Sequence, residues 1–308
     1  MPSPSLAELR VLECAVRTGS LSAAARDLGL SQQAVSARLR GLERLIGLEL
    51  VHRSPAGVAP TAAGDAVLAG AHEVLAAAAR LDAAIAELRG ESGAAALRVA
   101  ASQTIAAHLL PDWIVELRGA RLGAGRTTVQ VELRTANSEQ VIALVRGGDA
   151  DLGFIEQPEA PRGLAHAIVR HDRMVVAVAP QHEWAGRAMI PVDELARAPL
   201  VTREAGSGTR AAFERAVRER LGAEAAPPLM SLATEAAVRS AVARGVAPAV
   251  LSELTVLDDA RLGRIVAVPI GPAAVRRPLV AIWRGDARDL IGARRQLVEV
   301  AAAHGRDA

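Results

Sequence analysis

The sequence predicts a mainly helical domain over residues 1–60, a linker helix over 61–90 and an α/β domain over 91–308. Residues 20–53 contain two short apolar-periodic segments separated by Gly29, which indicates two helices and a tight turn. Residues 61–89 are rich in alanine and contain no proline, which favours one long helix. From Ala96 onward short apolar runs alternate with helical segments, a pattern typical of α/β proteins.

The second short helix has one clear apolar face. Its residues at spacings of four, three and four form a stripe that must be buried: Val35, Leu39, Leu42 and Ile46. Ser31 can cap the start of this helix by accepting a hydrogen bond from a free amide, and Gly47 is the residue type expected just past its end. The stripe and the two ends predict which side chains are left for solvent.

Those solvent-facing side chains are amides, a hydroxyl and arginines in the first turns of the helix: Gln32, Gln33, Ser36, Arg38 and Arg40. In a helix-turn-helix the first residues of the second helix reach deepest into the major groove of DNA. Glutamine suits adenine, arginine suits guanine or phosphate, and serine is permissive. A helix that is merely polar outside is the alternative, and for an isolated amphipathic helix it is the more common one.

The alanine-rich helix carries large apolar residues every seven positions: Val67, Val74, Leu81 and Leu88. Small residues lie between them, so a partner helix could approach closely, as in a coiled coil. At 1.5 Å per residue the helix would be roughly 40 Å long. Packing against its own domain is one interpretation; we favour pairing of two chains, because one DNA-reading helix covers only a half-site.

The C-terminal part alternates strands and helices, which implies parallel pairing with helices on the sheet faces. The number of units favours two sheets. The polar stretch 157–163 is the expected first crossing between them and residues 269–272 the second. This gives one half of about 91–160 plus 270–308 (subdomain I) and another of 161–269 (subdomain II), with a hinged cleft between them.

Open parallel sheets bind ligands beyond the carboxyl ends of their strands, where helices begin. Two stretches fit this position, and their candidate binding residues are Ser102, Gln103 and Thr104 in the first and Thr202 and Arg203 in the second. The second stretch continues into the sequence GSGT at 206–209, whose glycines let the backbone approach a ligand. Simple helix capping is the alternative for these hydroxyl residues.

Glu156 follows an apolar strand and is expected to face the same cleft. A buried carboxylate repels a bare anion unless it is paired or protonated. A ligand that offers hydroxyl or amine donors beside its acid would suit Glu156 better than a sulfate-like ion. The other interpretation is a latch in which Glu156 pairs with an arginine of subdomain II such as Arg203, and both remain open.

Enzyme chemistry is not indicated. The seven histidines are scattered without the spacing of a metal site, and a single cysteine excludes thiolate clusters. GSGTR lacks the lysine of a phosphate-binding loop, and Ser207 is not in the spacing of a nucleophile elbow. No catalytic residue, metal or cofactor is therefore expected.

Composition sets wider limits. The net charge is only +2, so DNA binding must depend on where the arginines lie rather than on a large positive field. Apolar residues make up 51% of the chain, which is ample for buried cores. No apolar run is long enough to span a membrane and no signal sequence is visible. A cytoplasmic protein without membrane partners is expected.

The chain resembles the LysR-type transcriptional regulators over almost its full length. The matching residues of the first domain are Ser31-Gln32, Ala34-Val35-Ser36, Leu39, Leu42-Glu43, Leu48, Leu50, Arg53, Pro60-Thr61 and Ala63-Gly64. The stretch REAGSGTR further resembles the branch of this family that contains regulators of sulfur assimilation and carbon fixation.

The resemblance implies a winged helix-turn-helix, a dimerising linker helix and a sensor half like periplasmic binding proteins. It implies base and backbone contacts for Gln32, Gln33, Ser36 and Arg40, and phosphate contacts for Arg38, Arg53 and Thr61. The expected partners are an interrupted palindrome of double-stranded DNA, a small, acidic effector, a second or further copies in a homodimer or homotetramer, and RNA polymerase. An architectural DNA-binding protein or a solute-binding protein without regulatory coupling is the alternative.

Overall fold

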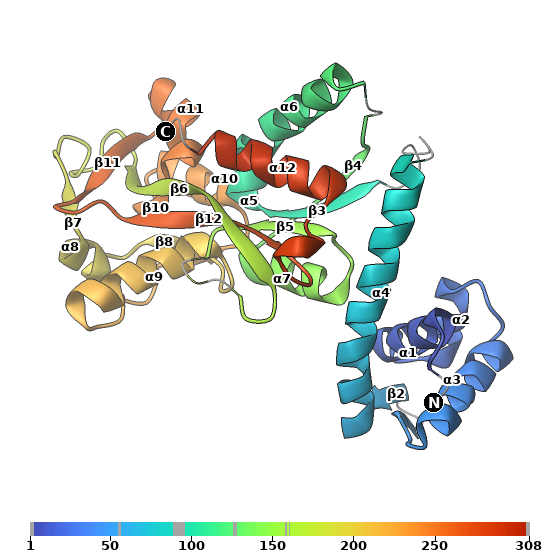
Figure 1. The fold of residues 1–308 in the computed structure, drawn as a ribbon. Coiled ribbons are helices and arrows are strands. Elements are labelled where there is room, and N and C mark those ends of the chain that lie inside the picture. The colour runs from blue at the N-terminus through green and yellow to red at the C-terminus, as the bar shows by residue number, and fades with distance from the viewer. Residues whose placement is uncertain are drawn as a thin grey trace. The chain divides into compact units, whose positions relative to one another are not determined.

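The computed structural model of the chain describes residues 3–54, 57–88, 96–125, 128–157, 159 and 161–305 (Figure 1). The chain divides into two compact units, Met1–Glu91 and Ser92–Ala308. The first is mainly helical and the second combines a mixed sheet with helices. The predicted fold class is therefore confirmed.

The N-terminal unit contains three short helices, a hairpin and a long helix: α1 (Leu6–Thr18), α2 (Leu21–Asp27), α3 (Gln32–Ile46), β1 (Val51–Ser54), β2 (Gly57–Pro60) and α4 (Ala62–Leu88). In α3 the predicted stripe faces the core, because Val35, Leu39 and Leu42 have no exposed surface. The α2–α3 turn and the apolar face of α3 are as the sequence predicts.

Both ends of α3 follow the local signals in the sequence. The Ser31 hydroxyl accepts a hydrogen bond from the Ala34 amide at 3.1 Å, and Gly47 closes the helix in the left-handed conformation with φ of 78°. Gly64 has a different role, since a Cβ atom there would collide with the carbonyl oxygen of Leu50. This close approach holds the start of α4 against the segment before the hairpin.

Helix α4 changes character along its length. Leu68 and Ala71 are buried in the core of the N-terminal unit, whereas Val74, Leu81 and Ile85 are exposed. The start of the helix therefore belongs to the N-terminal core, and the apolar residues beyond it face solvent in the single chain. Leu88, the last residue of the predicted heptad series, has a side chain outside the described part of the structure.

The second unit is built on one mixed sheet of order β4-β3-β5-β12-β6-β11-β7, with β10 also paired to β6 (Figure 1). Its strands are β3 (Leu97–Ser102), β4 (Val131–Ala136), β5 (Leu152–Ile155), β6 (Ala165–Val178), β7 (Ile190–Pro191), β10 (Ala249–Ser252), β11 (Val266–Gly271) and β12 (Arg276–Trp283). A separate parallel pair is formed by β8 (Val201–Arg203) and β9 (Met230–Leu232). Strands β3, β4 and β5 are parallel, as predicted, whereas β12 and β6 run antiparallel to their neighbours.

Helices cover this sheet: α5 (Gln103–His108), α6 (Leu110–Gly123), α7 (Ser138–Gly147), α8 (Val192–Arg197), α9 (Gly208–Leu221), α10 (Glu235–Ala243), α11 (Glu253–Arg261) and α12 (Gly292–Ala303), with a 3-10 turn at Ala287–Asp289. One core lies between β3, β5, β12, α6 and α12 and contains Trp113 against Phe154, with ring centroids 5.2 Å apart. Two other cores lie against the second part of β6. One is formed with α8 and α9, and the other with α10. Two halves with separate cores follow from this arrangement.

The two halves share β6. Residues 165–173 of β6 pair with β12, and residues 174–178 pair with β10 and β11. We call β3, β4, β5, β12 and residues 165–173, with helices α5–α7 and α12, the β3 half. Strands β7–β11 and residues 174–178, with helices α8–α11, form the β10 half. The chain thus passes between halves within β6 at Arg173 and Met174, later than the 157–163 stretch expected from the sequence. The reason is that β6 is one long strand, so no loop marks the transition.

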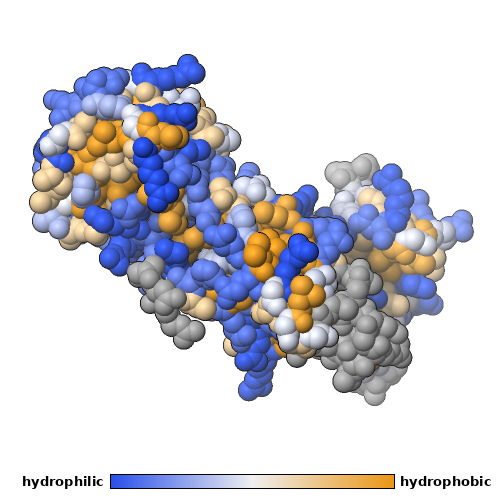
Figure 2. Space-filling view, turned by 90° about the horizontal axis from the view of Figure 1, so that it is seen from above, coloured by the Kyte–Doolittle hydropathy of each residue, from blue (hydrophilic) through white to orange (hydrophobic). Residues whose placement is uncertain are grey.

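Some apolar side chains reach the surface, among them Val115, Leu122, Leu229 and Leu262. Figure 2 shows hydrophobic residues in several patches among hydrophilic residues on the face that it draws. Among the described residues, no helix is both long and apolar enough to cross a membrane.

Candidate functional site

The candidate DNA-reading face is the solvent side of α3. Gln32, Gln33 and Arg40 are exposed and Ser36 is half-buried. The Arg40 Nη1 atom donates to the Ser36 hydroxyl at 2.6 Å, which holds the guanidinium along the helix. At about 100° per residue, these four side chains fall within one flank of α3, next to its buried stripe. The structure therefore brings four of the predicted DNA contacts onto one surface.

Arg38 lies on the other flank of α3, close to the start of α1. Its charge helps to lower the pKa of Glu8, although the larger causes are the hydrogen bonds that the Ser5 amide and hydroxyl donate to that carboxylate. Arg38 is exposed. Arg38 therefore lies away from the four side chains that are expected to contact bases. This position is compatible with the phosphate contact that the sequence predicts for it.

Thr61 and Arg53 were the other expected phosphate contacts. The Thr61 hydroxyl donates to the Glu49 carbonyl at 2.7 Å and accepts from the Gly64 amide at 2.9 Å, so it caps α4. To donate to a phosphate, this hydroxyl would first have to release Glu49. Arg53 lies in β1, and its side chain falls outside the described part of the structure.

The second candidate site is a buried polar network where the β3 and β10 halves meet. Arg277, at the start of β12, lies at its centre and has no exposed surface. Its Nη1 atom is 2.5 Å from Glu156 Oε2, and its Nη2 atom is 2.7 Å from Asp172 Oδ2. Asp172 is the residue that pairs with Arg277 in the register of β6 and β12. Burial alone would lower the pKa of Arg277, but the two carboxylates outweigh it and raise the pKa.

Hydroxyl groups complete the coordination of Arg277. Its Nη1 atom donates to Thr209 Oγ1 at 2.8 Å and its Nη2 atom to Thr104 Oγ1 at 3.3 Å. Ser102 donates to Glu156 Oε1 at 2.5 Å, and Ser252 donates to Asp172 Oδ1 at 2.9 Å. Because Ser102 and Thr104 belong to the β3 half and Thr209 and Ser252 to the β10 half, the network connects both.

A third carboxylate lies beside this cluster. Glu235, at the start of α10, accepts hydrogen bonds from Thr104 at 2.8 Å and Thr255 at 2.6 Å. Its amide donates to Gln103 Oε1 at 2.9 Å, while Gln103 Nε2 donates to the Ala233 carbonyl at 3.1 Å. The cluster formed by Arg277, Glu156, Asp172 and Glu235 therefore contains one guanidinium group and three carboxyl groups, all of them buried.

The predicted effector residues separate into two groups. Ser102, Gln103, Thr104 and Glu156 belong to the network, and Ser102 bonds to Glu156 instead of capping α5. Arg203 instead binds Glu204, with Nε 2.8 Å from Oε2. The arginine that pairs with Glu156 is Arg277, which belongs to β12 and therefore to the same half as Glu156, so this pair is not the latch to subdomain II that the sequence suggested.

The glycines of GSGT permit a close approach at this boundary. A Cβ atom on Gly208 would collide with the Glu156 carbonyl group and the Ser138 hydroxyl. The Ser207 side chain makes no capping hydrogen bond to α9. Thr202 lies apart from the network: it lines a cavity between β8 and α9, and its buried hydroxyl has no hydrogen-bond partner among the described residues.

Sequence reasoning missed the arginine at the centre and four of its neighbours: Arg277, Asp172, Glu235, Ser252 and Thr255. Buried arginine is rare, and VRRPLVAIW indicates a strand without marking which arginine turns inward. A polar residue entering an apolar strand, as Asp172 does before RMVVAV, was the available signal, but it does not identify a partner.

Comparison with known proteins identifies both units. The family described as "Bacterial regulatory helix-turn-helix protein, lysR family" matches residues 6–65, and the family described as "LysR substrate binding domain" matches residues 90–305. An uncharacterized HTH-type transcriptional regulator of Mycobacterium tuberculosis, Rv2282c, is 45% identical over 96% of this chain and 95% of its own length. The RuBisCO operon transcriptional regulator of Allochromatium vinosum is 30% identical over 98% of both chains.

A solved structure agrees in fold. Full-length OxyR from Pseudomonas aeruginosa, with one substitution, aligns over 99% of this chain and 96% of its own with a TM-score of 0.73 at 22% identity. The predicted resemblance to regulators of carbon fixation is confirmed, because the relatives include CbbR and the RuBisCO operon regulator. These relatives are transcriptional regulators and not enzymes, as the sequence predicts. The chain therefore belongs to the LysR family of transcriptional regulators, with an N-terminal helix-turn-helix domain and a C-terminal substrate-binding effector domain.

Proposed function

We propose that this regulator reads operator DNA with the exposed flank of α3. The observation that carries the proposal is that a buried apolar stripe fixes the orientation of α3, so that its polar side chains Gln32, Gln33, Ser36 and Arg40 share the solvent side. Amide and guanidinium groups at the start of the second helix are suited to base edges. Arg38 and Arg53 are assigned to phosphates, which set affinity and salt dependence.

The regulator acts as a dimer paired through α4. Val74, Leu81 and Ile85 are exposed in the single chain although they are large and apolar, and two of them are seven residues apart. A partner helix would remove these side chains from water and place two α3 helices on two half-sites of a palindrome. A homodimer, or a tetramer of two such pairs, acting on chromosomal DNA in the cytoplasm and on RNA polymerase is the form we propose.

The effector binds at the Arg277 network and displaces the ion pair between Arg277 and Glu156. A bare anion would meet three carboxyl groups beside a single guanidinium, whereas a small acid that also carries a hydroxyl or amine can offer a new partner to each member of the Arg277–Glu156 pair. The acid group of the effector pairs with Arg277, and its hydroxyl or amine donates a hydrogen bond to Glu156. Because Arg277 touches both halves, this exchange alters how tightly they are held together.

DNA binding tests the first part of this function. The full chain is titrated onto a duplex containing its own promoter region and onto a random duplex, with fluorescence anisotropy at several salt concentrations. We expect at least 10³-fold tighter binding to the promoter, the usual lower bound for a specific protein–DNA complex. Equal affinity for the two duplexes would reject sequence reading by α3.

A thermal-shift screen tests the effector. Hydroxy acids, amino acids and sugar phosphates are compared with inorganic sulfate and phosphate, and each compound that stabilises the protein is then added to the DNA titration. A compound that stabilises the wild type, fails to stabilise Ser102→Ala and changes DNA affinity supports the exchange. If sulfate alone does so, the proposed effector class is wrong, and if stabilising compounds leave DNA affinity unchanged, the protein is an uncoupled DNA-binding protein.

A further inference from the structure

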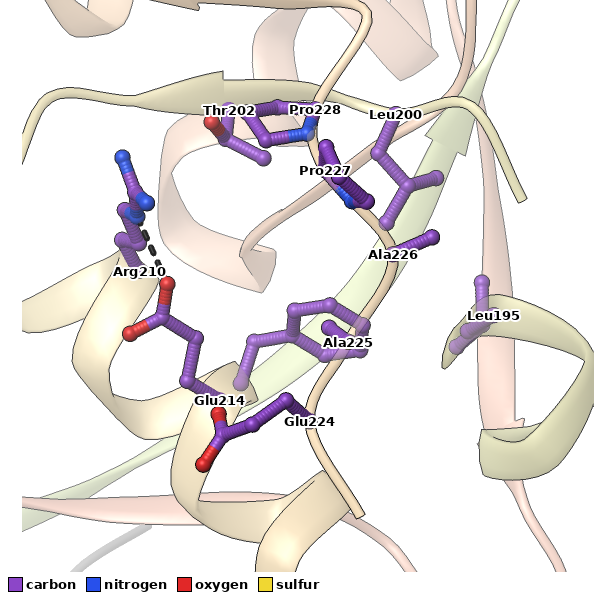
Figure 3. Close-up of a pocket in the computed structure, with 11 residues that line it drawn as sticks. Leu195, Leu200, Thr202, Arg210, Glu214, Glu224, Ala225, Ala226, Pro227 and Pro228 are labelled. Atoms are coloured by element: carbon purple, nitrogen blue, oxygen red, sulfur yellow. Dashed lines mark hydrogen bonds and ion pairs between the residues drawn. The ribbon is translucent and has the colours of Figure 1, made fainter. Parts of the chain in front are cut away.

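A cavity of about 230 Å³ lies in the β10 half, separate from the Arg277 network (Figure 3). It is enclosed by α8, β8, α9 and the segment 224–228, and none of the four charged residues of the network lines it. The lining residues are Leu195, Leu200, Thr202, Arg210, Phe213, Glu214, Glu224, Ala225, Ala226, Pro227 and Pro228.

One side of the cavity is apolar and fixed in place. Leu195, Leu200 and Phe213 are buried and form part of the core of the β10 half. The segment that closes the cavity is held at both ends, because the Ala226 amide donates to the Ala196 carbonyl at 2.7 Å and the Leu229 amide to the Leu200 carbonyl at 2.9 Å. The two successive prolines between these bonds restrict the backbone further.

The other side carries a pair of opposite charges. Arg210 Nε is 2.7 Å from Glu214 Oε1, and both side chains extend along one wall of the cavity in Figure 3. Within the described part of the chain, Arg210 Nη1 and Nη2 have no acceptor and Glu214 Oε2 has no donor. Glu224 is instead paired with Arg218 at 3.2 Å. Two guanidinium nitrogens and one carboxylate oxygen are therefore available beside an apolar wall.

We propose that this cavity binds an α-amino acid with a branched aliphatic side chain. Its carboxylate accepts hydrogen bonds from Arg210 Nη1 and Nη2, its ammonium group donates to Glu214, and its side chain packs on Phe213 and Leu200. The size agrees, since a cavity of about 150 Å³ holds benzene, and the larger one here suits a ligand of leucine size. A simple acid or a simple amine would satisfy only one member of the charge pair.

The position of the cavity gives such a ligand a route to the Arg277 network. At the start of α9 the Thr209 hydroxyl accepts a hydrogen bond from Arg277 at 2.8 Å and donates one to Glu156 at 3.5 Å, and Arg210 is the next residue on the same helix. On β8, Thr202 lines the cavity, and its neighbour Arg203 binds Glu204, which also accepts from Asn137 of the β3 half at 3.2 Å. A ligand that rigidifies α9 and β8 would thus stabilise elements that hold the two halves together. This regulatory consequence rests on the proposed function, whereas binding itself does not.

Calorimetric titration of the full-length protein without DNA tests the binding. The probes are L-leucine, isocaproate, which lacks the ammonium group, and isoamylamine, which lacks the carboxylate. We expect L-leucine to bind with a Kd of about 1 mM or tighter, and each analogue to bind at least tenfold more weakly. Failure of L-leucine to bind at about ten times that concentration, or equal affinity for all three probes, overturns the proposal.

Variants of α9 provide the matched comparison. Arg210→Gln and Glu214→Gln should each weaken L-leucine at least tenfold. Arg215→Gln and Glu219→Gln alter the neighbouring ion pair of the same helix, which has the same spacing and does not line the cavity, and should change affinity less than twofold. Thermal midpoints within about 2 °C of wild type verify that each variant is folded. Equal weakening by both pairs of variants would place binding elsewhere and reject the site.

Discussion

At the scale of single residues, the stability of the effector domain depends strongly on Arg277. Replacing it with methionine leaves Glu156 and Asp172 buried without their cation, so Arg277→Met should lower the free energy of unfolding by about 3–5 kcal/mol. Urea denaturation followed by tryptophan fluorescence measures this, because Trp113, Trp184 and Trp283 all lie in the second unit.

Two companion variants make that measurement decisive. Arg276→Met changes the exposed neighbour of Arg277 and should cost less than about 0.5 kcal/mol. Adding Glu156→Gln and Asp172→Asn to Arg277→Met removes the uncompensated charges and should recover much of the loss. A loss that the added variants leave unchanged would mean that packing, and not charge pairing, makes Arg277 important.

Glu8 gives a pH-dependent prediction for the N-terminal unit. The Ser5 amide and hydroxyl, and then Arg38, lower the pKa of its carboxylate, so the ionised form stabilises the capping box of α1. This contribution is present above the ordinary pKa of glutamate and is lost as pH falls through the lowered value. Glu8→Gln should therefore speed amide hydrogen exchange in α1 at neutral pH, corrected for intrinsic rates, and match wild type in acid. A difference that persists in acid would contradict the assignment.

At the scale of elements, the two flanks of α3 should affect DNA binding differently. Gln33→Ala should reduce discrimination by about 1–3 kcal/mol at a single base pair and leave random DNA unaffected. Arg38→Ala, on the other flank, should weaken binding to all duplexes and reduce the slope of log K against log salt by about one. Anisotropy with single-base operator variants checks both, and equal losses on specific and random DNA for Gln33→Ala would contradict base reading.

Helix α4 is the element expected to form the dimer. A charge in its exposed apolar stripe would be buried in the paired state, so Val74→Asp with Leu81→Asp should shift sedimentation from dimer to monomer. Ala69→Asp is the control, since Ala69 is exposed five positions before Val74 and therefore lies on another face. If the control dissociates the protein as well, or the double variant remains dimeric, α4 is not the dimer contact.

The elements show which features the sequence can predict. The start of α3, its buried stripe and its end depend only on residues in or next to that helix. Ser31, Leu39 and Gly47 were therefore sufficient to predict these three features from the sequence. The pairing of Arg277 with Asp172 depends on the register of two strands, in which the partners are 105 residues apart. Local periodicity carries no information on that register, and for the same reason it could not show that β6 continues from one half into the other.

At the scale of the whole molecule, regulation requires that effector and DNA affinities depend on each other. Such coupling is typically about 1–3 kcal/mol, which corresponds to a change of about 5–150-fold in DNA affinity when effector saturates the protein. Ser102→Ala removes a donor to Glu156 inside the network, whereas Thr202→Ala alters a residue of the separate cavity. Both lie in the second unit, so DNA affinity without effector should match wild type within about twofold.

The two variants should then differ once effector is present. We expect Ser102→Ala to lose the effector-dependent change in DNA affinity and Thr202→Ala to keep it, because only Ser102 belongs to the network that joins the halves. Anisotropy titrations of operator DNA with and without a compound selected by the thermal-shift screen measure the change. The reverse result, in which Thr202→Ala loses the response and Ser102→Ala retains it, would move the effector from the Arg277 network to the cavity between β8 and α9.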